Sequence, residues 1–337
     1  MKKVLPSIMK HVNQTEFGGP NVLKLGESLI PQPKTNQSLI EIHSTSVNRA
    51  DILQRQGKYP PPKGITNILG LEFAGYELDQ QGNRLRRVMG ILSGGGYAQY
   101  VAINKDHLIE IPSNIPFHTA GGISEIYLTA YLQYKLSELQ QGNACLVYAA
   151  ASGVGQATLQ LCNLFGVKAI ASCSQDKIQN IQHYTNLIVH RNQSIQDQIS
   201  QIKQYQPQGV QAVFDCVGQQ NYQITLDSLG MDGKWILYGL LTGGSIDKFN
   251  LAPLLIKRIH LINSTLRSRS DQFKAQLVQE FKINILPFIE NGQISIPIES
   301  VTKVTWDQQG INQIIGLHTL MESNKNVGKL IIQFLNE

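Results

Sequence analysis

The sequence predicts an α/β fold, in which a doubly wound parallel-sheet domain is joined to a β-rich domain. An apolar run, a turn of small residues and a helical pattern follow one another within Tyr148–Leu161. Strand and helix patterns then alternate with short connections, whereas residues before about 125 show no such alternation. The 337 residues are enough for two domains that each bury their own core.

Residues 1–124 favour strands and irregular turns. Strand patterns lie at Leu39–Val47, Ile68–Glu77 and Ser93–Val101. Between the first two, Asn48–Pro62 contains a short helix followed by a stiff proline turn. This part therefore predicts a β-dominated domain.

From residue 125 the pattern predicts βαβαβ units. A helix, Glu125–Leu139, precedes the small-residue turn. The strands expected after the turn are Lys168–Cys173, Asn186–His190, Val210–Val217, Lys234–Tyr238 and Leu261–Leu266. The helices expected between and after them are Gln175–Tyr184, Ser194–Tyr205, Gln219–Leu229 and the long Asp271–Glu290. A final strand is expected at Lys329–Leu335. Short connections of this kind imply a parallel sheet covered by helices on both faces. The expected domains are 125–290 for the parallel sheet, and 1–124 with 291–337 for the β-rich part.

The turn within Tyr148–Leu161 has the character of a pyrophosphate site. The free N–H groups and the positive dipole end of a helix start favour an anion. The dinucleotide-binding pattern asks for glycine at three positions, which here hold Ala150, Ser152 and Gly155. An ordinary strand–turn–helix stays open as the alternative for this stretch alone.

Composition and charge indicate a globular chain. The net charge of +5 is scattered, apart from a cluster at Arg84–Arg87, so a nucleic-acid partner is not expected. No apolar run approaches the roughly 18 residues of a membrane span, and the first twelve residues lack the apolar core of a secretory signal. The four cysteines are far apart and are expected to be reduced core residues: Cys145, Cys162, Cys173 and Cys216. A cytoplasmic location is expected, with a mitochondrial one as the alternative.

Eight stretches, in the same order along the chain, resemble the medium-chain dehydrogenase/reductase superfamily. They are NRADILQRQGKYPPP (Asn48–Pro62), NILGLEFAG (Asn67–Gly75), GGGYAQYV (Gly94–Val101), SGVG (Ser152–Gly155), FDCVG (Phe214–Gly218), DGKWILYGLLTGG (Asp232–Gly244), LLIKRIHLINSTLRSRS (Leu254–Ser270) and NKNVGKLII (Asn324–Ile332). Within the superfamily they resemble the zeta-crystallin-like quinone oxidoreductases, in particular the tumour-suppressor-inducible type. The resemblance implies a GroES-like catalytic domain, a Rossmann domain and an NADPH-dependent quinone oxidoreductase.

The residues do not favour a zinc site. Metal-dependent relatives place a cysteine in the segment that matches Asn48–Asp51 and a His-Glu pair in the segment that matches Leu71-Glu72. Here Asn48 and Leu71 stand at those positions, and no cysteine lies within residues 1–144. Zinc needs three or four N, S or O ligands, so no metal is expected. Without a Lewis acid, a quinone or an activated enone is the favoured hydride acceptor, because its product delocalises the charge.

The resemblance also implies catalytic residues. Asn48 and Asp51 are expected near the nicotinamide ribose and the substrate, and Tyr59 is expected to donate a hydrogen bond to the quinone oxygen. The alternative is that Asn48 and Asp51 cap the following helix and that Tyr59 packs under the prolines. Thr129 is expected to contact the nicotinamide amide, or else to occupy an ordinary helix position.

The cofactor prediction favours NADPH over NADH. The strand that ends at Cys173 carries no acidic residue at its tip, where an NAD enzyme binds the ribose diol. Ser174 and Lys177 can hold a 2′-phosphate, Arg191 lies nearby, and Asp176 is expected to face solvent. The pyrophosphate is expected at Ser152, through its N–H and hydroxyl, with Gly153, Val154 and Gly155.

Further contacts follow from the resemblance alone. They are Val217 and Gly218 near the adenine ribose, Tyr238 and Gly239 beside the nicotinamide ribose, Leu266 and Arg267 over the nicotinamide, and Asn326 with Lys329. Relatives pair the edge strand that matches Leu261–Leu266, so a homodimer is expected.

Two departures from the family pattern keep other functions open. The segment between Glu77 and Gly94 is short, and Ala150 replaces a turn glycine. One alternative is an enone or enal double-bond reductase. The other is a catalytically weak member that serves as a structural or accessory subunit of a larger assembly, with Arg84–Arg87 as a contact surface.

Overall fold

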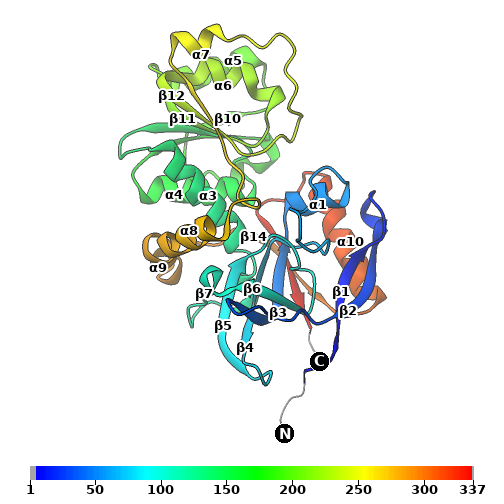
Figure 1. Ribbon diagram of the computed structural model, residues 1–337. Helices are drawn as coiled ribbons and strands as arrows, with labels where there is room; N and C mark the ends of the chain where they lie inside the picture. Colours follow the sequence, from blue (N-terminus) through cyan, green and yellow to red (C-terminus); the bar gives the residue numbers. More distant parts are fainter. Residues whose placement is uncertain (1–4, 336–337) are drawn as a thin grey trace. The chain divides into compact units, whose positions relative to one another are not determined.

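The computed structural model describes residues 5–335, and the chain divides into two compact units (Figure 1). The terminal unit comprises residues 1–128 and 266–337, and the central unit comprises residues 129–265. Residues 266–290 thus belong to the terminal unit, whereas the sequence grouped them with the parallel sheet. The reason is local packing: helix α8 (Asp271–Asn284) lies against η2 (Lys105–His107), and His107 Nε2 is 3.0 Å from the Asp271 carbonyl oxygen.

The central unit is a six-stranded parallel sheet in the order β10-β9-β8-β11-β12-β13. Its strands are β8 (Ala144–Val147), β9 (Lys168–Cys173), β10 (Ile188–His190), β11 (Val210–Asp215), β12 (Leu229–Leu237) and β13 (His260–Asn263). The chain starts in the middle, runs to one edge and returns to build the other half. The order therefore reverses between β8 and β11, which is the doubly wound topology that the sequence predicts.

Helices cover both faces of this sheet. α4 lies on one face, and α5 and α6 lie together on the other (Figure 1). The helices of this unit are α4 (Gly153–Leu164), α5 (Ile195–Tyr205), α6 (Tyr222–Ser228) and α7 (Ala252–Ile256), with 3-10 turns η3 (Gln175–Asn180) and η4 (Gln219–Asn221). Because both faces are covered, the strands are apolar almost throughout.

The terminal unit is built on a seven-stranded sheet in the order β14-β15-β3-β4-β5-β7, with β6 also paired to β3. Its strands are β3 (Gln37–Val47), β4 (Glu72–Leu78), β5 (Arg84–Ile91), β6 (Tyr100–Asn104), β7 (Ile109–Glu110), β14 (Ile298–Val304) and β15 (Lys329–Phe334). β15 lies antiparallel beside β3, so a strand from the end of the chain completes a sheet that begins near residue 37. This pairing brings Lys329 next to the segment that follows β3.

The terminal unit contains further elements besides this sheet. They are β1 (Ile8–Gln14), β2 (Leu23–Leu29), η1 (Pro20–Val22), α1 (Arg49–Arg55), α2 (Phe117–Ala120), α9 (Leu286–Glu290) and α10 (Gln308–Glu322). β1 and β2 form a separate antiparallel pair, and α10 packs on β2 and β14. Helix α3 (Ser124–Ser137) contains the boundary between the two units.

Several predicted boundaries are wrong. The long helix Asp271–Glu290 is two helices, because Pro287 lacks an N–H and disfavours a helical residue before it, so α8 ends at Asn284. The helix expected at Gln175–Tyr184 is only the 3-10 turn η3, and the last central strand ends at Asn263 rather than at residue 266.

Candidate active site

The turn between β8 and α4 leaves two peptide N–H groups available. Ser152 caps α4, and its hydroxyl oxygen accepts a hydrogen bond from the Gly155 N–H at 3.1 Å. Within residues 5–335, the N–H groups of Gly153 and Val154 have no acceptor. Free N–H groups at a helix start bind anions, so the turn fits a pyrophosphate. The Ser152 N–H, which was expected to join them, donates instead to the Ala149 carbonyl oxygen at 2.8 Å.

A glycine at position 155 lets α4 pack closely on its strand. A Cβ there would lie 2.4 Å from the Ala149 carbonyl oxygen and 2.7 Å from Ala150 Cα. Ala150 itself is fully buried, and its N–H donates to the Ser172 carbonyl oxygen at 3.0 Å. The extra methyl at position 150 is therefore packed into the interior and is not exposed to a ligand.

The candidates for 2′-phosphate binding meet at the carboxyl ends of β9 and β10. Ser174 and Lys177 follow β9, and Arg191 follows β10. The exposed Asp176 lies among them: a hydrogen bond with Ser174 lowers its pKa, and Lys177 and Arg191 contribute in the same direction. A phosphate at this place would therefore have to displace the Asp176 carboxylate from the Ser174 hydroxyl.

The turn after β11 is organised by Asp215, which the sequence pattern did not single out. Its Oδ1 accepts the N–H groups of Val217 at 2.7 Å and Gly218 at 3.0 Å, and its Oδ2 accepts Trp235 Nε1 at 3.0 Å. Burial raises the pKa of Asp215. The two N–H groups expected near the adenine ribose are thus used within the protein.

The remaining predicted contacts of the central unit are Tyr238, Gly239 and Thr129. Tyr238 and Gly239 follow β12, and a Cβ at Gly239 would lie 3.0 Å from the Cys216 carbonyl oxygen. Burial raises the pKa of Tyr238 well above its ordinary value, and Cys216 is its nearest polar neighbour. Thr129 is a half-buried position within α3.

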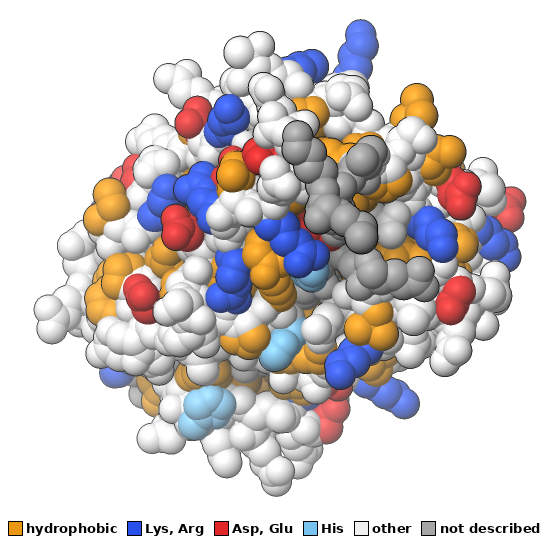
Figure 2. Space-filling model, turned by 90° about the horizontal axis from the view of Figure 1, so that it is seen from below, with side chains coloured by type: hydrophobic (Ala, Val, Ile, Leu, Met, Phe, Trp, Pro, Cys, Tyr) orange, Lys and Arg blue, Asp and Glu red, His pale blue; other side chains and the backbone are white. Residues whose placement is uncertain are grey.

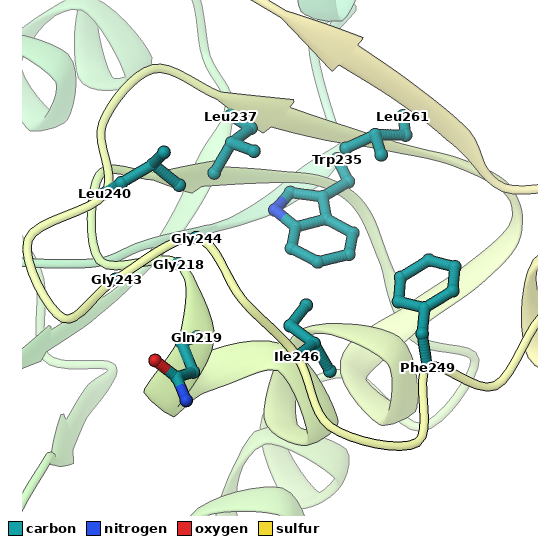
Figure 3. Close-up of a pocket in the computed structure, with 10 residues that line it drawn as sticks. All are labelled: Gly218, Gln219, Trp235, Leu237, Leu240, Gly243, Gly244, Ile246, Phe249 and Leu261. Carbon is teal, nitrogen blue, oxygen red and sulfur yellow. The ribbon is translucent and has the colours of Figure 1, made fainter.

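An apolar pocket of about 330 Å³ lies beside the carboxyl ends of β11 and β12 (Figure 3). Trp235 faces Ile246 and Phe249 across it. The lining residues are Gly218, Gln219, Trp235, Leu237, Leu240, Gly243, Gly244, Ile246, Phe249 and Leu261. Of these, Gly218 is the one predicted cofactor contact. The lining suits an uncharged group rather than a phosphate.

In the terminal unit, Asn48 and Asp51 hold the start of α1. The Asn48 N–H donates to Asp51 Oδ2 at 2.8 Å in a capping box, and the Gly70 N–H donates to Asp51 Oδ1 at 2.9 Å. Asp51 is completely buried, and burial raises its pKa to about 6. These contacts are those of the capping alternative, and a contact with a ligand stays a prediction.

A buried ion pair lies beside Asn48. Lys329 Nζ is 2.8 Å from Glu72 Oε1 and 2.7 Å from Asn48 Oδ1. Asn48 Nδ2 at 3.0 Å and the Ser46 hydroxyl also donate to Glu72 Oε1, and the Glu125 N–H donates to Oε2 at 3.0 Å. The Glu72 and Lys329 side chains are 0% and 3% exposed. The cluster therefore supplies the partners that buried charges require, and it occupies the Lys329 ammonium that was expected to contact the cofactor.

Glu125, in the first turn of α3, lies next to this ion pair. Burial raises its pKa to about 8, and the charge of Glu72 adds to the rise. The raised pKa corresponds to a free-energy preference of roughly 5 kcal/mol for the neutral carboxyl. The dipole at a helix start favours the carboxylate by only about 0.3–1 kcal/mol. No group in residues 5–335 donates a hydrogen bond to the Glu125 carboxyl. Burial beside Glu72 therefore favours the protonated form of the Glu125 carboxyl.

Tyr59 lies under the guanidinium group of Arg267, whose Cζ is 5.2 Å from the ring centroid. Arg267 donates to the carbonyl oxygens of Ser93 at 2.8 Å and Tyr59 at 3.3 Å, and to Gln54 Oε1 at 2.5 Å. Arg267 thus holds the segment that carries Tyr59. The Tyr59 hydroxyl has no partner in the described chain, and burial raises its pKa, so it is a free proton-bearing donor.

Leu266 and Asn326 are the last two predicted contacts. Both are 8% exposed and belong to the terminal unit. Asn326 Nδ2 donates to the Gly328 carbonyl oxygen at 3.1 Å. Neither side chain is more than marginally accessible.

The residues do not fit a zinc site. The part of the chain that the structure describes contains no group of three or more His, Cys, Asp or Glu placed to hold a metal ion. Asn48 is bonded to the Lys329 ammonium, and Leu71 is a buried apolar side chain. An ammonium group, rather than ligands for a metal, thus lies beside Asn48.

The basic cluster on β5 is largely neutralised. Arg84 Nε lies 2.7 Å from Glu41 Oε2, and Arg86 Nε lies 2.6 Å from Glu77 Oε2. Arg87 donates hydrogen bonds to backbone carbonyl oxygens. Seen from below the view of Figure 1, positive and negative side chains are interspersed (Figure 2). No helix within residues 5–335 has the length and hydropathy of a membrane-spanning segment.

Three residues important to these sites were missed from the sequence. Glu72 follows Leu71 directly, Glu125 is an acid in the first turn of a helix, and Asp215 lies inside the FDCVG stretch. Glu72 and Asp215 lie inside sequence stretches that carry the family resemblance. The pairing of Glu72 with Lys329 joins positions 257 residues apart, and no local pattern indicates it.

Comparison with known proteins supports the resemblance. A family model described as zinc-binding dehydrogenase matches residues 153–282. Human quinone oxidoreductase is 28% identical over 312 residues, which cover 88% of this chain and 92% of that protein. The mouse synaptic vesicle membrane protein VAT-1 homolog-like is 29% identical over 260 residues, or 72% of this chain; the match spans only 60% of that relative's length.

Solved structures share the fold. A mycobacterial protein in complex with NADPH has a TM-score of 0.83 at 22% identity, covering 96% of this chain and 100% of that one. CurK enoyl reductase has a TM-score of 0.82 at 20% identity, covering 98% and 100%. Together with the colinear sequence stretches and the two-unit α/β architecture, these matches support a quinone oxidoreductase-like member of the medium-chain dehydrogenase/reductase superfamily.

Proposed function

We propose that this oxidoreductase is NADPH-dependent and zinc-independent, and that it transfers hydride to a quinone or a similar conjugated carbonyl. The observation that carries the proposal is the Lys329–Glu72 ion pair, in which Lys329 also donates a hydrogen bond to Asn48. Asn48 lies in the segment where metal-dependent relatives carry a cysteine. Without a metal to stabilise an oxyanion, the acceptor itself must delocalise the charge, as a quinone does. Relatives named quinone oxidoreductase support this substrate class.

The roles of this chain's residues follow from their contacts. A bound nicotinamide dinucleotide supplies the hydride. The N–H groups of Gly153 and Val154 bind its pyrophosphate. Tyr59 donates a hydrogen bond to the substrate oxygen, and Arg267 fixes the Tyr59 segment. Leu266 and Asn326 act by packing, and the ion pair supplies balanced charge beside Asn48.

The test uses the purified full chain. NADPH fluorescence measures cofactor binding, and loss of NADPH absorbance measures turnover with an ortho-quinone and, separately, with an α,β-unsaturated ketone. We expect binding, and turnover that is faster with the quinone. Binding without turnover across a broad panel of both substrate classes would contradict the proposal and favour an accessory subunit.

Reduction of an enone double bond is the second candidate function. It is supported by the shared fold with solved enoyl reductases and by Glu125, a carboxyl whose raised pKa favours the protonated form and which interacts electrostatically with Tyr59. Faster turnover of the unsaturated ketone than of the quinone would select this candidate.

We also propose a homodimer formed through the edge strand β13. Leu261 on β13 is 41% exposed, and Leu255 and Ile256 of α7 are 80% and 70% exposed. An unpaired edge with exposed apolar residues needs a cover. Light scattering should give twice the 37.5 kDa chain mass, and Leu255→Glu should shift it toward the monomer while Leu85→Glu on β5 should not. A monomeric wild type would refute the dimer.

A further inference from the structure

Two carboxyl groups in the terminal unit share one ammonium group. Glu72 and Glu125 interact electrostatically, and each also interacts with Lys329. The Glu125 N–H lies 3.0 Å from Glu72 Oε2, so the two residues are in direct contact. Two carboxylates held close together in a buried site repel each other, and this repulsion favours the neutral form of one of them.

The hydrogen bonds assign the charge to Glu72. It accepts from the Lys329 ammonium, the Asn48 amide, the Ser46 hydroxyl and the Glu125 N–H. The Glu125 carboxyl receives no hydrogen bond from the described chain. Two carboxyl groups whose surroundings favour opposite protonation states are the usual arrangement of an acid beside a charge-stabilising partner.

Glu125 also lies close to the proposed substrate donor. Its charge acts on Tyr59, on Arg267 and on Lys274 of α8. Glu125 is partly exposed, in contrast to Glu72, which is fully buried. The free Tyr59 hydroxyl and the unpaired Glu125 carboxyl therefore interact electrostatically, and burial favours the protonated form of each.

We propose that Glu125 is a catalytic acid, which protonates the anionic oxygen formed when hydride adds to the conjugated carbonyl. The inference rests on the proposed function. Hydride from the reduced nicotinamide dinucleotide brings one electron pair to the substrate, which leaves a phenolate or enolate oxygen. The Glu125 O–H bond breaks as the new substrate O–H bond forms, and the resulting carboxylate takes a proton from water afterwards.

Other charged groups set the pH range in which Glu125 can act. Glu72 and Asp51 oppose its ionisation, and Lys329 and Arg267 favour it. The titratable and charged groups around it, by element, are Asp51 on α1, Tyr59 after α1, Glu72 on β4, Arg267 before α8, Lys274 on α8 and Lys329 on β15. With the group half-ionised at about pH 8, kcat should be level near neutral pH and fall above it.

Glu125→Gln keeps the size of the side chain and removes the proton. We expect kcat with an ortho-quinone to fall about 100-fold, and the fall of kcat above pH 8 to disappear. The Kd for NADPH should stay within about twofold, and Glu125→Asp should restore part of the activity with its pH dependence. Glu16→Gln, an exposed glutamate, is the matched control and should behave as wild type.

Infrared difference spectra between wild type and Glu125→Gln give a readout that needs no turnover. A protonated-carboxyl band present in the wild type at pH 7, and lost above pH 8, supports the proposal. Absence of that band, or an active wild type whose Glu125→Gln variant keeps kcat and its pH profile, overturns it while leaving the proposed function intact. A wild type inactive with both substrate classes overturns both.

Discussion

Asp51, Glu72 and Glu125 are carboxyl groups of the same unit with different surroundings. The Asp51 carboxyl accepts hydrogen bonds from two peptide N–H groups, and the Glu72 carboxyl accepts one from the Lys329 ammonium group. The Glu125 carboxyl accepts no hydrogen bond within the described chain. Their local donors therefore assign structural, charge-balancing and proton-carrying roles to residues of one chemical type.

Tyr59→Phe tests the substrate donor. The Tyr59 hydroxyl makes no hydrogen bond within residues 5–335, so its removal leaves the fold unaffected. We expect turnover of a quinone to fall about tenfold, the value of one neutral hydrogen bond, while NADPH binding stays within a few-fold. Steady-state kinetics and fluorescence titration measure the two quantities. Unchanged turnover would remove Tyr59 from the mechanism.

Lys177→Ala and Asp176→Asn form a pair that tests the 2′-phosphate site. In the proposed site, Lys177 would attract the phosphate, and Asp176 would compete with the phosphate for Ser174. We expect Lys177→Ala to weaken NADPH about tenfold more than NADH, and Asp176→Asn to tighten NADPH relative to NADH. Titration of each variant with both cofactors provides the measurement. Equal changes for the two cofactors would refute this location for the phosphate.

His318 links stability to acid pH. It is completely buried, its Nδ1 lies 3.1 Å from the Arg55 guanidinium and its Nε2 lies 3.2 Å from the Tyr97 hydroxyl. Because a guanidinium only donates, Nδ1 accepts and the ring is neutral. Burial, with the charge of Arg55, lowers its pKa to about 3.

The unfolded chain therefore binds a proton at His318 below pH 6.5 that the folded chain does not. This residue should make the free energy of unfolding rise by about 1.4 kcal/mol per pH unit between pH 4 and 6.5, and remain level above that range. Asp51, whose pKa is raised to about 6, has the opposite effect: it makes the free energy of unfolding fall as the pH rises toward 6. Comparing denaturant unfolding of wild type and His318→Gln isolates the histidine; a pH-independent difference would contradict its neutral state.

The sequence identified single residues where their function is local. Ser152 and Gly155 lie at a helix start that a short pattern reveals, and both occupy the turn as predicted. Arg267 and Lys329 were assigned to the cofactor, but their partners come from distant segments, Gln54 and Glu72. The sequence immediately around Arg267 and Lys329 contains no information about those pairings.

The start of α4 is the element on which the proposed cofactor binding depends. In Gly155→Ala the new Cβ would lie 2.4 Å from a backbone oxygen, so the helix has to move. We expect a loss of about 1–3 kcal/mol in stability and weaker NADPH binding. Gly316→Ala in α10 is the matched control: its Cβ meets open space, and we expect a gain of up to about 1 kcal/mol. Equal effects of the two changes on thermal unfolding would contradict the close-packing account.

Regular elements were predicted best where periodicity and flanking residues agree. β9 has the expected bounds, and the helix expected at Ser194–Tyr205 is α5, which Ser194 caps. The interruption at Pro287 shows that helical periodicity alone does not reveal a break between α8 and α9. β14 was missed, because its exposed and half-buried residues form a strand only through pairing with β15.

Across the whole chain, both units contribute residues to the proposed reaction. The parallel sheet supplies an anion-binding helix start, and the terminal unit supplies Tyr59, Glu125 and an ion pair beside Asn48. Size and strand–helix alternation predicted the two units, and the family resemblance implied their roles. The exact boundary depends on which surface α8 covers, and that is a property of tertiary packing.

Oxidation of NADPH deuterated at C4, by chelator-treated protein with an ortho-quinone, tests metal-free hydride transfer most directly. The proposed function predicts turnover that chelation leaves unchanged and that slows with deuterium at the transferred position. Turnover that stops on chelation and returns with zinc, or no turnover of any quinone, would contradict it.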